Sequence, residues 1–232
     1  MENIIVKKHK GPSLGYVALA FTLLFNIGLS FVISLKGIPP YFPGPWEPTV
    51  KIVSYFQDQP HSVLFCAFFQ FCSSIPLGIF TATVASRLSF LGSTAAGKNI
   101  ALFGGFLTVF NMALSSMLMW VMAYPGIAAD ANIIRTLYYA VFIIGGVGYS
   151  VPFGLLIAGI SVTSWFMKTL PKWLTISGIV LALIGEASSF YMVLPTLLFL
   201  IPLTRFPGFI WLIITGFKLA KSKPEKTRHT VF

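Results

Sequence analysis

Apolar residues dominate the chain in long runs, and short stretches that hold proline, glycine or basic residues separate these runs. Each run approaches the roughly 20 residues that an α-helix needs to cross a bilayer. Helices are favoured there because they satisfy their own backbone polar groups. The pattern predicts an all-α, polytopic integral membrane bundle, a single domain over residues 1–220 with six transmembrane helices at about 14–35, 61–85, 99–123, 134–162, 173–192 and 208–220.

Two proline-rich breaks interrupt the apolar pattern. The first follows residue 35, and its Glu47-Pro48 pair predicts a short helix ending near Gln57, because proline is tolerated in a first helical turn. The second, Pro195 to Pro207, is expected to separate the last two spans. The tail at 221–232 is polar and basic, so we expect it to be disordered and to meet anionic lipids of the bilayer.

Charge changes the picture in two ways. Charged residues make up 9% of the chain, against about 25% in a typical soluble domain, so lipid is the expected surroundings. The net charge of +10 gathers between apolar runs rather than in a basic stripe, which argues against nucleic acid. Twelve Lys and Arg residues fall on one side and four on the other. The positive-inside rule then predicts a cell-membrane protein with both termini cytoplasmic.

A short motif occurs twice, in the second and fourth predicted spans. Residues 74–78 read Ser-Ile-Pro-Leu-Gly and residues 150–154 read Ser-Val-Pro-Phe-Gly. With a two-residue shift in the loop, the match extends to Gly104 and Gly178. Spans two–three and four–five would then be parallel copies about an axis along the membrane normal, as in some transporters. Chance similarity between apolar helices is the alternative.

Polar residues near the middle of the spans are the candidates for function, because such residues are rare in membranes. Glu186 is the acidic residue of the predicted spans and shares a helical face with small residues. The candidates for a ligand-binding or proton- or cation-binding site are Glu186, Asn111, Gln70, Asn26, Tyr149, Ser150 and Ser74. The alternative is that these side chains form hydrogen bonds between helices.

Two prolines lie in this same polar layer. Pro76 and Pro152 cannot donate to the carbonyls four residues back, those of Cys72 and Gly148. In a membrane such carbonyls need a side chain, a water or a ligand as partner.

Chemistry-bearing residues are sparse. The three histidines lie outside or at the edges of the predicted spans, so paired-histidine haem ligation and a zinc site of the His-Glu-x-x-His kind are not expected. Cys66 and Cys72 share one predicted helix and cannot bridge to each other. We therefore expect no catalytic residues, no metal and no cofactor.

The second half also resembles a known family. The resemblance rests on the Ser-x-Pro helix of the first half and on four features of the second: Pro171–Leu174, Gly178, Phe206–Ile213 and Gly216. These resemble the bacterial six-helix membrane proteins grouped as domain of unknown function 4386, with Phe209 where we expect an acidic residue in that family. The resemblance implies a six-helix fold and no particular substrate.

Two functions follow as hypotheses. The first is a non-enzymatic, multi-pass membrane protein that binds a small ligand or a partner within the bundle. The second is a small-solute or ion transporter that works through the polar layer around Glu186. A membrane-embedded enzyme ranks third.

Overall fold

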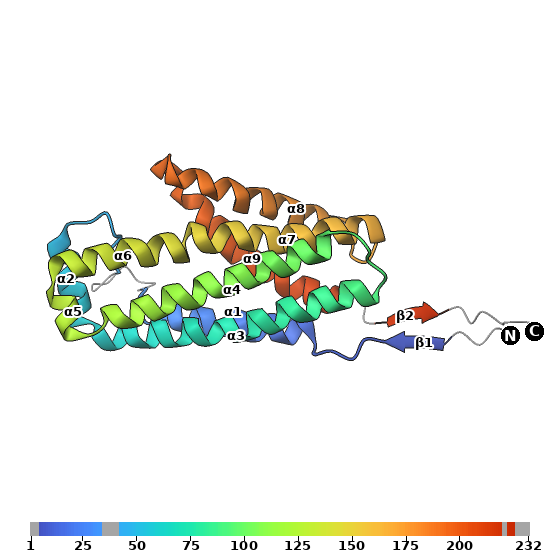
Figure 1. Ribbon diagram of the computed structural model, residues 1–232, viewed down its shortest axis with the longest axis horizontal. Coiled ribbons are helices and arrows are strands. Elements are labelled where there is room, and N and C mark those ends of the chain that lie inside the picture. Colours follow the sequence, from blue (N-terminus) through green and yellow to red (C-terminus); the bar gives the residue numbers. More distant parts are fainter. Residues whose placement is uncertain (1–4, 34–41, 220–221, 226–232) are drawn as a thin grey trace, which may run out of the picture.

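The structure, a computed structural model, describes residues 5–33, 42–219 and 222–225. It is a bundle of antiparallel helices (Figure 1). The long helices are α1 (Leu14–Ser30), α3 (Pro60–Phe90), α4 (Gly97–Met122), α6 (Ala131–Gly145), α7 (Val147–Met167), α8 (Lys172–Ala187) and α9 (Leu200–Lys218). Short elements are α2 (Thr49–Asp58), α5 (Pro125–Ala129) and the 3₁₀ helices η1 (Ser188–Met192) and η2 (Pro195–Phe199).

The helices confirm the predicted all-α membrane bundle. Five helical segments of the described chain are long and apolar enough to cross a membrane: Pro60–Phe90, Gly97–Met122, Ala131–Met167, Lys172–Met192 and Pro195–Lys218. The shorter α1 has 17 residues and is therefore about 25 Å long, slightly less than a hydrocarbon core of about 30 Å. The predicted sixth crossing depends on α1.

The first and the last described segments of the chain pair with each other. Strand β1 (Ile5–Lys8) pairs antiparallel with β2 (Ser222–Glu225), so both termini lie at one end of the bundle, here called the terminal end (Figure 1). Helices α2 and α5 lie at the opposite end, the loop end. The strand at 222–225 corrects the expectation of a wholly disordered tail, and residues 226–232 lie outside the described residues.

The fourth predicted span is present but broken. Helix α6 ends at Gly145 and α7 begins at Val147, with Gly146 between them at φ −89° and ψ −96°. The apolar pattern continues across this point, so it gave no sign of the break. Asp130 begins α6 by accepting hydrogen bonds from the backbone N–H groups of Asn132 and Ile133 at 2.9 and 3.1 Å, as a helix N-cap does.

The predicted start of the last span was wrong. Helical structure begins at Pro195 in η2 and continues through α9, with Pro207 inside the helix. Proline fits the first turn of a helix, so Pro195 starts the last span here, and the break between the last two spans is limited to residues 193–194. Pro207 removes one backbone hydrogen bond, which the helix tolerates.

Helix α2 confirms the short helix predicted after Glu47-Pro48. Its buried face holds Ile52, Tyr55 and Phe56, whereas Val50 is 79% exposed. These aromatic side chains pack into a second core cluster at the loop end, distinct from the larger cluster that α1, α3, α7 and α9 share.

Helices α4 and α7 approach most closely at glycine. A Cβ built on Gly104 would lie 2.6 Å from both the Pro152 oxygen and the Leu156 nitrogen. A Cβ on Gly159 would lie 2.4 Å from the Ala101 nitrogen. Small residues permit such backbone contact between membrane helices, and this contact holds α7, with its break, beside α4.

Arg87 is buried at the terminal end, 1% exposed. Its Nη2 donates to the Pro12 oxygen at 3.1 Å. The His9 ring lies against Phe90 at 5.5 Å between centroids, and its Nε2 is 3.1 Å from the Ser86 hydroxyl. Burial, and then the nearby Arg87 charge, lower the pKa of His9. This group of contacts ties the chain before α1 to the end of α3.

The directions of four helices match the predicted repeat. Helices α3 and α7 run from the loop end to the terminal end, and α4 and α8 return (Figure 1). Pro76 and Pro152 lie inside α3 and α7. Superposition of the two helix pairs stays a prediction.

Candidate functional site

A pocket of about 490 Å³ lies at the loop end of the bundle. It lies beside the break between α6 and α7. The start of α9 and the segment that begins at residue 42 also line it. Its wall is mainly aromatic and aliphatic, with contributions from α1, α3, α4, α6, α7 and α9. The lining side chains include Phe25, Leu29, Val32, Trp46, Cys66, Gln70, Met112, Ser115, Met119, Tyr138, Phe142, Tyr149, Leu198, Ile201 and Arg205.

A second hollow, of about 560 Å³, lies on the outer side of α3 and α4. Its lining includes Phe65, Phe68 and Trp120, which are about half exposed. Exposed aromatic rings on transmembrane helices are an ordinary lipid-facing surface. The loop-end pocket is therefore the candidate functional site, because charged and polar groups line it.

Arg205 extends from α9 into the wall of the loop-end pocket. Its Nη2 donates to the carbonyl oxygen of Gly145. Its guanidinium carbon lies 4.5 Å from the centroid of the Tyr149 ring and 5.3 Å from that of Phe25. Its Nε is buried and has no hydrogen-bond partner in the described part of the chain. A cation thus stands among aromatic faces at the edge of an apolar cavity.

The break between α6 and α7 explains where Arg205 binds. The Tyr149 N–H bonds to the Gly146 oxygen at 3.2 Å, which leaves the Gly145 carbonyl to the Arg205 guanidinium. Further along α7, the Asn111 amide donates to the Gly148 oxygen, the carbonyl that Pro152 leaves free. A broken span lined by side-chain donors is typical of membrane-protein ligand sites, where irregular backbone faces a cavity.

Tyr149 contributes a second polar group to the wall. The residue is 1% exposed, and its hydroxyl has no hydrogen-bond partner among the described residues. Ser115, from α4, is already engaged, because its hydroxyl donates to the Val141 oxygen at 3.0 Å. The Tyr149 hydroxyl is therefore a buried donor behind the pocket wall without a partner in the described chain.

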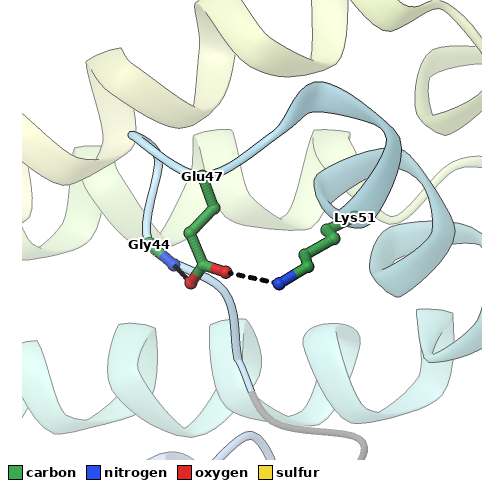
Figure 2. A network of polar contacts seen from close by, with 3 residues as sticks. All are labelled: Gly44, Glu47 and Lys51. Carbon is green, nitrogen blue, oxygen red and sulfur yellow. Dashed lines mark hydrogen bonds and ion pairs between the residues drawn. The ribbon is translucent and has the colours of Figure 1, made fainter.

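A segment at 42–58, here called the cap, lies at the loop end, and its residues 42–47 line the pocket there. The Tyr138 hydroxyl donates to the Pro43 oxygen, and the Trp46 ring packs edge-on against Phe142 at 5.5 Å. Figure 2 shows the turn within the cap: Gly44 N–H donates to Glu47 Oε1 at 2.9 Å, and Lys51 Nζ lies 3.6 Å from Glu47 Oε2. These contacts fix the cap over the cavity.

The predicted site residues divide between the pocket and other places. Gln70 and Tyr149 line the pocket, and Asn111 supports its wall through the Gly148 carbonyl. Ser74 bonds back to the Phe71 oxygen at 2.6 Å within its own helix. The Ser150 hydroxyl is buried without a partner in the described chain.

Asn26 differs from its prediction. It is exposed on α1, and its amide donates to the Thr22 oxygen at 2.8 Å. A polar side chain that hydrogen-bonds to a carbonyl one turn back in its own helix can lie on the outer face of that helix. The position of Asn26 along α1 therefore did not show which face of the helix it is on.

Glu186 lies between α8 and α7, away from the pocket lining. A Cβ on Gly154 would be 3.3 Å from Glu186 Oε1, so the carboxyl group packs on the α7 backbone. Oε1 is buried, and no hydrogen bond reaches it from the described residues. The expected hydrogen bond to another helix is therefore not formed by this oxygen.

Arg205 is the main site residue that the sequence prediction missed. It was assigned to a loop because the prolines around it suggested a break between spans. Pro195 instead begins a helix, which places Arg205 within a span. An arginine inside a transmembrane helix is rare and typically functional, so recognising Pro195 as a helix start would have found it.

Comparison of the chain with protein-family models, with curated proteins and with solved structures finds no match. The resemblance to the six-helix family therefore stays a prediction.

Proposed function

We propose that this multi-pass membrane protein binds a small, mainly apolar ligand in the loop-end pocket and performs no chemistry on it. The observation that carries the proposal is the pocket itself: about 490 Å³ of space beside a broken transmembrane helix whose carbonyls are bonded by Arg205 and Asn111. Ligand pockets in proteins typically measure about 300–1,000 Å³ and are largely apolar with a few placed polar groups.

The chemistry of the wall favours binding over catalysis. Nucleophilic catalysis needs a nucleophile with a base within hydrogen-bond reach. Ser115 donates to a backbone oxygen, and histidine does not occur among the described residues that line the pocket. Cys66 lies in the wall, buried and free. These groups can shape a cavity, and they do not form an activated pair.

The orientation belongs to the same proposal. The basic residues Lys98, Lys172 and Lys218 lie where α4 and α8 begin and α9 ends, at the terminal end. Positive residues favour the cytoplasmic side. We place the terminal end in the cytoplasm, against anionic lipids, with α1 as the sixth crossing and the pocket toward the outer face.

Native mass spectrometry of the purified protein tests the binding. Leu198→Trp would fill the pocket, and Leu194→Trp is the matched control, because Leu194 is exposed outside the lining. We expect a bound small molecule on the wild type and on Leu194→Trp, and its loss from Leu198→Trp. Equal retention by all three proteins would contradict pocket binding.

Glu186 supports the alternative function, transport of protons or cations. Its buried carboxyl oxygen without a described partner is an arrangement that proton carriers use. Proteoliposomes with an enclosed pH-sensitive dye would test it: a transporter should pass protons down an imposed gradient, and Glu186→Gln should not while keeping its fold. No flux through the wild type would reject proton transport by this residue.

A further inference from the structure

The loop-end pocket contains a cation, Arg205, that has no anionic partner among the residues that the structure describes. Arg205 forms no ion pair with the described residues. Its Nη2 donates a hydrogen bond to the Gly145 carbonyl oxygen. Its Nε–H remains buried and unbonded. Burying a charge without a partner is costly, and the faces of Tyr149 and Phe25 offset part of that cost. An acceptor from outside the chain would complete the arrangement.

The Tyr149 hydroxyl is a second donor in the same wall. It is buried and unpartnered, and its ring is the one on which the Arg205 guanidinium stacks. Glu47 also lines the pocket, but its carboxylate is held by the Gly44 N–H and by Lys51. The two free donors therefore require an acceptor, and the acidic residue of the lining is already engaged.

The rest of the cavity suits an apolar body. Phe25, Met112, Met119 and Phe142 line it, and methionine adapts to irregular apolar shapes. We propose, building on the ligand-binding function above, that the ligand is a small amphiphilic carboxylate. Its carboxylate accepts hydrogen bonds from Arg205 Nε and the Tyr149 hydroxyl once these side chains turn from their buried positions toward the pocket that they line, and its apolar body lies beneath the cap. One guanidinium matches the single charge and planar shape of a carboxylate.

Two probes that share one apolar ring system and differ in their polar group separate the contribution of the carboxylate to binding. We would measure 2-naphthoic acid and 2-naphthalenemethanol by equilibrium dialysis against the protein in lipid nanodiscs, with empty nanodiscs as reference. The wild type should bind the acid at least tenfold more tightly than the alcohol. Arg205→Gln should lose this preference and bind the acid and the alcohol with equal affinity, because the charge that selects the carboxylate is gone.

Tyr149→Phe supplies a second, milder variant if Arg205→Gln does not fold. It removes the hydroxyl alone, and we expect it to lower the preference for the acid over the alcohol severalfold without abolishing it. Equal affinity of the wild type for acid and alcohol would overturn the carboxylate assignment and leave the binding function standing. Binding of neither probe above empty nanodiscs would count against the binding function itself. A phospholipid retained in the pocket on native mass spectrometry would overturn the assignment of a free carboxylate.

Discussion

Buried donors and backbone acceptors explain most of the polar residues at the loop end. The sequence predicted that Pro152 would free the Gly148 carbonyl, and Asn111 bonds to that oxygen. The sequence could not predict that the Gly145 carbonyl would also be free, because that depends on the turn at Gly146. Arg205 bonds to it from a helix whose start was assigned wrongly.

Asn111 and Pro152 should be coupled. Asn111→Leu leaves the Gly148 carbonyl unpaired, and we expect a loss of about 1–3 kcal/mol in the free energy of unfolding. In a Pro152→Ala background the new backbone N–H can donate to the same carbonyl, so the loss should be smaller. Unfolding in mixed detergent micelles gives both values. An equal loss in the two backgrounds would show that Asn111 does not serve this carbonyl.

His9 should make stability depend on pH. Its pKa is lowered from 6.5 by burial and by Arg87, so the unfolded chain takes up the proton first as pH falls. Neutral His9 therefore contributes fully to the free energy of unfolding above about pH 6.5. This contribution is lost as pH falls through the folded-state pKa of His9. The thermal unfolding midpoint should drop more between pH 8 and pH 5 in the wild type than in His9→Gln, which cannot titrate. Identical drops would refute the role of His9.

At the scale of elements, apolar periodicity located the helices better than it located their ends. Span 61–85 corresponds to α3, which continues to Phe90, and span 99–123 corresponds to α4, which begins and ends slightly earlier, at Gly97 and Met122. The break at Gly146 was not predicted, because the apolar pattern continues across it, although the glycines at 145, 146 and 148 weaken a helix there. Pro195 misled the prediction since proline both starts and ends helices.

Helix contacts at glycine predict a steric effect. Gly104→Ala would push a Cβ to 2.6 Å from the α7 backbone, so α4 and α7 must separate, at about 1–3 kcal/mol in unfolding free energy. Gly78→Ala is the control, because its nearest described neighbour would be Val109 at 3.9 Å. Alanine there should be neutral or stabilise by up to about 1 kcal/mol. Chemical unfolding of both variants measures the difference, and equal effects would rule out tight α4–α7 contact.

At the scale of the whole molecule, the pairing of β1 with β2 puts both termini at one end. The composition and the alternation of apolar and basic stretches predicted the membrane bundle. The pocket could not be predicted, because it is built from six helices whose relative rotations are set by contacts such as that at Gly104.

Cysteine labelling tests the topology. In a chain with Cys66 and Cys72 replaced by alanine and serine, a cysteine at Lys10 should be protected from a membrane-impermeant reagent in intact cells. A cysteine at Lys51, in the cap, should react. Labelling of both positions from the same side would show that α1 does not cross the membrane, which contradicts the six-helix topology.

A density map of the loop-end pocket would show whether it holds a ligand. Cryo-electron microscopy of the wild type in nanodiscs, with a bound antibody fragment to aid alignment, would resolve the region between Arg205, Tyr149 and the cap. We predict non-protein density in the pocket that touches the Arg205 guanidinium and vanishes in Leu198→Trp. A pocket that is empty, or closed by movement of the cap against α9, would contradict ligand binding in the loop-end pocket.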